Sequence, residues 1–253
     1  MSKLKILITN DDGIHAPGLV ALREVLKEKY DCIVSAPSSE SSATSHAVTL
    51  HDKLLVEEYH DEYGPFYSVV GRPADCVKLA VREFMSDLPD LVVSGINRGP
   101  NLGVSVYYSG TVGGAREGAI CGIPSLALSV ASHSVDNYEL ACSVSDQLIE
   151  FVSKNLEAFH FHLLNVNIPW VEPDKYQGVR WTKQARSMFR EKFDQTVLEE
   201  KKYEYQLGGD MFVVDEDEND DTKAVKEGFT SVTPIQLDTT DYNFLDKYKD
   251  AKI

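Results

Sequence analysis

Two adjacent carboxylates follow a short apolar segment near the start of the 253-residue chain. Leu4 to Ile8 is rich in leucine and isoleucine, which predicts a buried strand, and Asp11 and Asp12 come shortly after it, just before Gly13. Neighbouring side chains on a strand point to opposite faces, but a loop broken by glycine can turn both carboxylates toward one point. Two like charges about 4 Å apart repel by roughly 4 kcal/mol at an effective dielectric constant near 20. A shared divalent cation would remove this cost.

The residues from Asn10 to Gly13 also favour an ordinary turn that caps the next helix, and both interpretations stay open at this point. Three phosphate-site patterns are excluded. The loop has no Gly-x-Gly-x-x-Gly, and the glycines at 13 and 18 are not followed by the Lys-Ser/Thr of a Walker loop. Asn10 stands where a phosphatase of the haloacid dehalogenase type needs an aspartate, and an amide cannot be phosphorylated.

The elements that must position these carboxylates alternate between helix and strand. Apolar residues spaced along a helix from Pro17 lead to a second predicted strand at Cys32 to Ala36. Further segments continue the pattern: strands at Phe66–Val70, Leu91–Ser94, Ser125–Val130 and around His162–Val166, and helices after Pro73, after Ser109 and over Asn137–Lys154. This alternation predicts an α/β fold with three α/β/α layers and a Rossmann-like, mostly parallel sheet.

Three further loops leave the predicted strands at their carboxyl ends, where open parallel sheets bind ligands. Ser38 to Ser45 is rich in hydroxyl groups, and Gly95 to Gly103 contains three glycines, one proline and two asparagines, which is typical of a tightly shaped loop. Ser109 to Ala115 opens a helix with small and hydroxyl residues, a pattern that suits phosphate binding at a helix N-terminus. A flexible serine loop and ordinary helix capping are the alternatives.

The character of the chain changes after Pro169. Alternating residues at Tyr203 to Leu207 predict hairpin-like strands. The acidic run from Asp215 to Asp221 predicts a solvated loop, and a second cation site is the minor alternative for it. A charged helix is predicted at the end of the chain. We therefore divide the chain into an α/β core over residues 1–177 and extended C-terminal segments over 178–253. The second part lacks the apolar periodicity for a core of its own, so we expect it to form subunit contacts.

Charge and composition exclude several classes of function. Forty acidic and twenty-five basic residues give a net charge of −15, which argues against nucleic acid polymers as partners. The four cysteines have no zinc spacing, the seven histidines include no His-Glu-x-x-His, and no Gly-x-Ser-x-Gly is present. Without a signal-like N-terminus or a run of eighteen apolar residues, we expect a cytoplasmic protein with no membrane partner.

Taken in chain order, the motifs resemble the SurE family of stationary-phase survival phosphatases, which act as nucleotidases. In the N-terminal half the motifs are Thr-Asn-Asp-Asp-Gly from Thr9, Ala36-Pro37 with a serine five residues after the proline, Gly-x-Pro-Ala-Asp-Cys-Val from Gly71, Ser-Gly-Ile-Asn-x-Gly-Pro-Asn-x-Gly from Ser94 and Tyr-Ser-Gly-Thr-Val from Tyr108. Further along the chain they are Asn-Val-Asn-Ile-Pro from Asn165 and Gly-Phe-Thr-Ser-Val-Thr-Pro from Gly228. The chain departs from the family at Ala43, Arg72 and Arg116, and residues 183–227 align poorly, which leaves base and sugar selectivity open.

The resemblance implies a metal-dependent phosphomonoesterase, a 5′-nucleotidase that acts on nucleoside monophosphates through a water molecule polarised by the metal. It implies one Mg²⁺ or Mn²⁺ per subunit, held by Asp11, Asp12, Ser42 and Asn97, with catalysis assigned to Asp11, Asp12 and Asn97. It also implies phosphate contacts from Asn101, Ser109, Gly110 and Thr111, and a homodimer or homotetramer. Hard oxygen ligands agree with these ions. Activity on 3′-nucleotides and short polyphosphate stays open, and a non-catalytic nucleotide-binding module with a structural cation is the alternative function.

Overall fold

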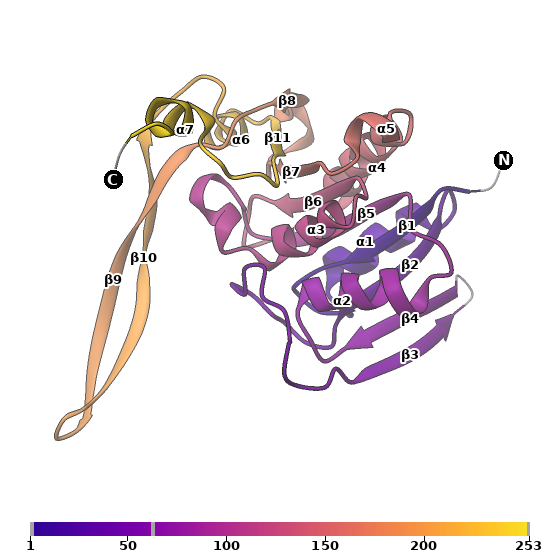
Figure 1. Ribbon diagram of the computed structural model, residues 1–253, viewed down its shortest axis with the longest axis horizontal. Helices are drawn as coiled ribbons and strands as arrows, with labels where there is room; N and C mark the ends of the chain where they lie inside the picture. Colours follow the sequence, from indigo (N-terminus) through magenta and orange to yellow (C-terminus); the bar gives the residue numbers. More distant parts are fainter. Residues whose placement is uncertain (1–2, 62–63, 252–253) are drawn as a thin grey trace.

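A nine-stranded sheet runs through the computed structural model, which describes residues 3–61 and 64–251 (Figure 1). The strand order is β3-β4-β2-β1-β5-β6-β7-β11-β8, with antiparallel pairing at β3–β4 and β7–β11 and parallel pairing elsewhere. The strands are β1 Lys5–Thr9, β2 Asp31–Pro37, β3 Val56–Asp61, β4 Gly64–Val69, β5 Leu91–Arg98, β6 Ser125–Val130, β7 Leu163–Ile168, β8 Val179–Trp181 and β11 Thr230–Ile235. The predicted mostly parallel α/β sheet is confirmed.

Helices cover both faces of this sheet. On one face lie α1 (Pro17–Leu26) and α4 (Glu139–Ser153), and on the other lie α2 (Pro73–Leu79) and α3 (Gly110–Ile120), as Figure 1 shows. The shorter helical segments are a π-helical turn Ala80–Phe84, 3₁₀ turns Gly103–Tyr107 and Pro173–Lys175, α5 Leu156–Phe159, α6 Asp221–Lys226 and α7 Tyr242–Tyr248. No helix in the described ranges is long and apolar enough to cross a membrane.

The central strands explain why the apolar run at the N-terminus is continuous. Ile6, Leu7 and Ile8 are all fully buried, because helices cover β1 on both faces. The strand at Leu91 runs four residues beyond the predicted end at Ser94, because β5 pairs again with β6 at Asn97 after a shift of register. β3 was not predicted, since it lies at the sheet edge and its side chains are mostly exposed and polar.

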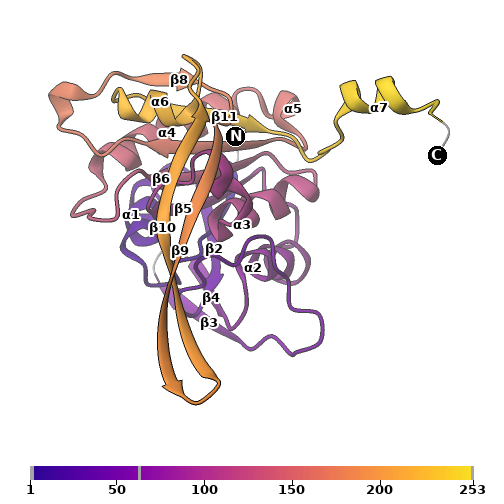
Figure 2. The same cartoon turned by 90° about the vertical axis from the view of Figure 1, so that its left-hand side faces the viewer.

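The C-terminal region contributes to the body and also leaves it. β8 and β11 follow residue 177 in the chain but extend the main sheet, so that sheet continues across the predicted boundary at 177/178. β9 (Arg186–Glu199) and β10 (Lys202–Asp215) form a separate antiparallel hairpin that projects from the body (Figures 1 and 2). The predicted hairpin is therefore confirmed. Figure 2 shows α7 at the end of an arm on the other side of the molecule from α1.

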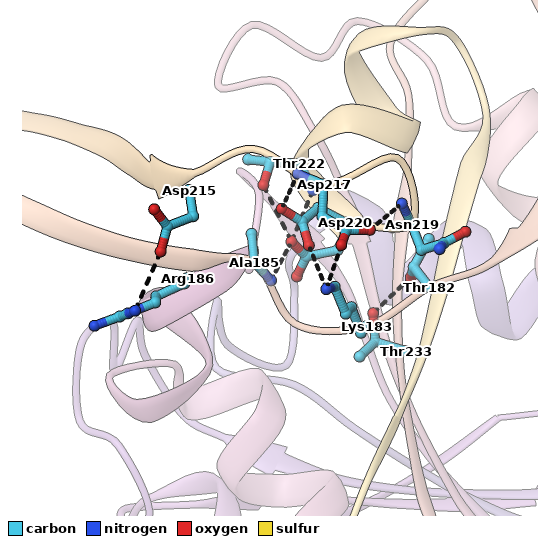
Figure 3. A network of polar contacts seen from close by, with 11 residues as sticks. Thr182, Lys183, Ala185, Arg186, Asp215, Asp217, Asn219, Asp220, Thr222 and Thr233 are labelled. Atoms are coloured by element: carbon cyan, nitrogen blue, oxygen red, sulfur yellow. Dashed lines mark hydrogen bonds and ion pairs between the residues drawn. The ribbon is translucent and has the colours of Figure 1, made fainter.

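The acidic run is not simply a solvated loop, which corrects the prediction for its last two residues. Asp220 and Asp221 are 3% and 0% exposed, and Asp221 begins α6. Its carboxylate accepts hydrogen bonds from the backbone N–H groups of Gly103 at 2.9 Å and Ala185 at 3.0 Å. Figure 3 shows the surrounding network at the base of the hairpin. Within the described residues no group of three or more His, Cys, Asp or Glu side chains could hold a metal ion, so a second cation site here has no support.

Candidate functional site

The loop after β1 is held in shape by Asn10. This side chain is fully buried, its Oδ1 accepts from the N–H of Gly13 at 3.2 Å, and its Nδ2 donates to the Gly13 carbonyl at 2.8 Å. Gly13 has a φ of +102°, a conformation that favours glycine, and a Cβ there would lie 3.3 Å from the backbone of Ser39. Asn10 therefore fixes the turn that presents the two aspartates.

Asp11 lies against the start of helix α3. It is 4% exposed, and its Oδ1 accepts a hydrogen bond from the Thr111 hydroxyl at 2.5 Å. The approach requires glycine at position 110, because a Cβ there would lie 2.8 Å from the Cβ of Asp11. Burial raises the pKa of Asp11 to about 6, although hydrogen bonds from the side chain and backbone of Thr111 oppose the rise.

Asp12 is half-buried, and its Oδ2 lies 3.3 Å from the backbone N–H of Arg98, which donates to it. Burial raises the pKa of this carboxyl, the negative charge of Glu40 raises it further, and the Arg98 backbone and charge oppose the rise. Within the described residues neither Asp11 nor Asp12 forms an ion pair with a basic side chain. The site therefore has an excess of negative charge.

The loops of the other two predicted metal ligands meet the aspartates. The Ser41 N–H donates to the Asp11 carbonyl at 2.7 Å, which places the chain beside Ser42 next to the first loop. The Ser42 hydroxyl donates to Glu40 Oε1 at 2.7 Å, and Nδ2 of the Asn97 side chain donates to the Gly99 carbonyl at 2.8 Å. In both cases the side chain acts as a donor, and the lone pairs of its oxygen are left for another partner.

The predicted phosphate contacts divide into two groups. Ser109 is the N-cap of α3, where its Oγ accepts from the Val112 N–H at 3.1 Å, and Gly110 and Thr111 form the first turn beside Asp11. Asn101 is oriented differently, because its Nδ2 donates to Ser129 Oγ at 2.8 Å and the side chain is directed toward β6. Its contact with phosphate stays a prediction, for which the second N–H of the amide is available.

Glu40 was missed in the sequence interpretation, which concentrated on the serines around it. Its carboxylate accepts from Ser42 and acts on Asp12, so it adds a third negative charge close to the proposed ligands. The available signal was its spacing, since a carboxylate two residues before an expected ligand serine can reach the same point. Glu40 is exposed, so water screens its charge more than that of Asp11.

A buried carboxylate on α3, also missed, anchors the serine loop. Glu117 is 3% exposed, and its two oxygens accept from Lys78 Nζ at 2.6 Å and pair with His46 Nε2 at 2.8 Å. Burial alone would raise the pKa of Glu117, but these two partners together hold it below its usual value. Because His46 lies four residues after Ser42, the contact ties the loop to the helix that also carries Thr111.

Two asparagines on β7 fix the loop around Asn101. Nδ2 of Asn165 and Nδ2 of Asn167 donate to the Asn101 carbonyl at 2.8 Å and 3.2 Å, and Oδ1 of Asn167 accepts from the Asn101 N–H at 2.7 Å. The Asn-x-Asn spacing on a strand was the signal for this arrangement, because alternate residues share a face of the sheet.

Known proteins resemble this chain in sequence and in fold. Residues 6–191 match the family model described as survival protein SurE. A protein named 5′-nucleotidase SurE from Natranaerobius thermophilus is 43% identical over 95% of this chain and 95% of its own, and one of the same name from Desulforudis audaxviator is 44% identical over 97% and 96%. The crystal structure of the SurE protein from Aquifex aeolicus superposes with a TM-score of 0.83 at 37% identity, over 97% of this chain and 98% of that chain.

Proposed function

Because this chain belongs to the SurE family, we propose that it is a 5′-nucleotidase, which hydrolyses the phosphate ester of nucleoside 5′-monophosphates. Relatives that carry this name match it over almost their whole length. The observation that supports the proposal most directly is the contact between Asp11 and Thr111. This contact places an acidic loop beside the N-terminus of a helix. The loop would hold the cation and the helix N-terminus would bind the phosphate ester, and the reaction needs both at one point.

The residues of the site fit a divalent cation, Mg²⁺ or Mn²⁺. Two carboxylates whose pKa values are raised by burial lack a basic partner among the described residues, and the oxygens of Ser42 and Asn97 are free to accept. All four donors are hard oxygens, which favours these ions over zinc. We therefore assign Asp11, Asp12, Ser42 and Asn97 as its ligands. When bound, the cation would polarise a water molecule and neutralise charge on the phosphoryl oxygens.

The start of α3 would hold the phosphate. Helix N-termini present N–H groups without intrahelical partners, and the helix dipole favours negative charge there. Two carboxylates lie beside this helix start and would repel a negatively charged phosphate. The phosphate therefore needs the helix N–H donors as well as the cation in order to bind there. We assign Ser109, Gly110 and Thr111 to this role. Gly110 also allows the close approach of the helix to Asp11.

Water is the nucleophile in this proposal. Asn10 is buried and engaged with Gly13, and the Ser109 hydroxyl caps the helix. The Thr111 hydroxyl has a carboxylate acceptor in Asp11 but is fully buried. A direct displacement by water should invert the configuration of a chiral phosphate, and acid quenching during turnover should trap no phosphorylated protein. Retention of configuration, or label on Asp11 or Thr111, would replace this mechanism with a covalent one.

Phosphate release from adenosine 5′-monophosphate by the purified chain tests the function. We expect release with Mn²⁺ or Mg²⁺ and none after the metal is removed with a chelator and the chelator is dialysed away. Addition of the metal should restore it. The alternative, a non-catalytic nucleotide-binding module with a structural cation, predicts nucleotide binding that depends on metal without any release of phosphate.

We further propose that the C-terminal region forms subunit contacts in a homodimer or homotetramer. The hairpin and α7 expose large apolar side chains, among them Phe193 at 61%, Tyr205 at 59% and Phe244 at 62%. Such side chains on projecting segments are typical of surfaces that a partner covers. A truncation before Tyr242 should reduce the assembly measured by sedimentation, and a full-size oligomer would contradict this role for α7.

A further inference from the structure

A cavity lies away from the proposed metal ligands. It has a volume of about 430 Å³ and forms where α3, the 3₁₀ turn Gly103–Tyr107 and the segments that follow β8 and β11 meet. Small-molecule sites in proteins have volumes of about 300–1,000 Å³. Its polar lining includes Tyr107, Arg116, Gln236 and Thr239, and none of its lining residues belongs to the metal or phosphate positions assigned above.

Arg116 is an unusual cation in this chain. It is half-buried, and its only hydrogen bond among the described residues runs from Nη2 to the Val106 carbonyl at 3.4 Å, although a guanidinium has five N–H donors. No carboxylate pairs with it in the part of the chain that the structure describes. Arg23, Arg180 and Arg186 each have such a partner. The other unpaired arginines among the described residues are exposed to solvent, whereas Arg116 is half-buried. Burial lowers the pKa of Arg116, and the Tyr107 hydroxyl opposes this change.

The rest of the cavity provides donors and no competing acid for this guanidinium. Lys183 also lines it, but its Nζ is neutralised by Asp217 at 2.7 Å, with Asp220 at 3.9 Å. The side chains of Tyr107, Gln236 and Thr239 donate no hydrogen bond within the described residues. A polar group that enters the cavity therefore meets one uncompensated positive charge and several free donors.

We propose that this cavity is a binding site for a small oxyanion, the phosphate or carboxylate group of a metabolite, which Arg116 recognises. The planar guanidinium matches both groups through paired hydrogen bonds. The site is distinct from the proposed metal site, although Arg116 follows Thr111 by five residues on the same helix, about 8 Å along its axis. The inference therefore does not depend on the nucleotidase function.

Chemical labelling tests the site on the full-length wild-type protein. Phenylglyoxal reacts with arginine, and peptide mapping by mass spectrometry reports each arginine separately. At a phosphate concentration ten times the dissociation constant, labelling of Arg116 should slow by about tenfold, because only the free fraction reacts. A parallel series with malonate distinguishes the two sources of oxyanion: slowing by phosphate alone indicates a phosphorylated ligand, and slowing by malonate indicates a carboxylate.

Arg82 is the internal control, because it is exposed and lies outside this cavity, so its labelling should not change. Calorimetry gives the matched comparison: Arg116→Gln should lose one class of phosphate sites that Arg82→Gln retains. Equal labelling of Arg116 with and without both anions would overturn the proposal. It would also be overturned if Arg116 were unreactive in the wild type and became reactive after removal of residues 240–253, since an aspartate in the arm of a second copy would then be its partner.

Discussion

The loop that carries Asp11, at the carboxyl end of the central strand β1, and the β9–β10 hairpin differ in how their strands are supported. Around Asp11, β1 lies between two parallel neighbours and is covered on both faces, so the core fixes where its carboxylates point. In the hairpin, Ser187 is the only buried residue that the structure describes. A two-stranded ribbon is at best marginally stable in water. Precision at the site therefore comes from the core, whereas the hairpin depends on its base and on whatever covers it.

The two regions meet at Asp221. Its carboxylate accepts from Gly103, at the end of the loop that carries Asn97 and Asn101, and from Ala185, next to the first residue of β9. Gly103 has a φ of +52°, and a Cβ there would lie 2.1 Å from Ser187 Oγ, so the loop and the hairpin base pack without space for a side chain. The hairpin is thus connected to the site loop through a buried carboxylate.

The largest expected effect comes from removing charge in the first region alone. Asp11→Asn and Asp12→Asn should each lower metal-dependent turnover by about a thousandfold or more, because each removes half of the carboxylate charge that would hold the cation. The fold should persist, since an uncompensated charge is removed. Phosphate release and thermal unfolding with and without Mn²⁺ measure the two effects.

Asp210→Asn is the matched control, because Asp210 is an exposed hairpin residue and its replacement gives the same change of net charge. It should leave turnover unchanged. Wild-type activity in either loop variant would remove the metal assignment, and a loss in Asp210→Asn would show that the hairpin takes part in the reaction.

The contrast between the regions also explains what the sequence could predict. Continuous apolar runs in the sequence predict the buried strands. The position of Asp11 and Asp12 just after such a run predicts that they lie at a strand end. The side chain of Asn101 could not be oriented from its motif, because its orientation depends on Ser129, which lies on a different strand. The burial of Asp221 was hidden for a similar reason: its partners Gly103 and Ala185 are distant in sequence, and an acidic run by itself predicts solvent.

A smaller effect is expected at the junction of the two regions. Asp221→Asn should lower the free energy of unfolding by roughly 3 kcal/mol. Both carboxylate oxygens accept from backbone N–H groups, so the NH₂ of an asparagine would face one of these N–H groups, donor against donor. Urea unfolding measures it. Asp215→Asn is the control, since Asp215 pairs with Arg186 on the surface and the change should cost less than about 1 kcal/mol. Equal costs would mean that Asp221 does not connect the regions.

The smallest effects come from adding one methyl group to a glycine in each region. At Gly110 the new Cβ would lie 2.8 Å from Asp11 Cβ and 2.9 Å from its Oδ2. Gly110→Ala should therefore push the helix start away from the carboxylate, at a cost of about 1–3 kcal/mol in stability. A displacement of this kind should also lower turnover by about tenfold to a hundredfold.

At Gly208, in the exposed hairpin, the nearest atom to the new Cβ is the Lys192 carbonyl oxygen at 3.8 Å, an ordinary contact. Gly208→Ala should change stability by no more than about 0.5 kcal/mol and leave turnover unaffected, because nothing has to move. Phosphate release and urea unfolding of both variants, measured side by side, compare the regions through the same chemical change. If the two variants behaved alike, the close contact between α3 and Asp11 would not be what sets the geometry of the site.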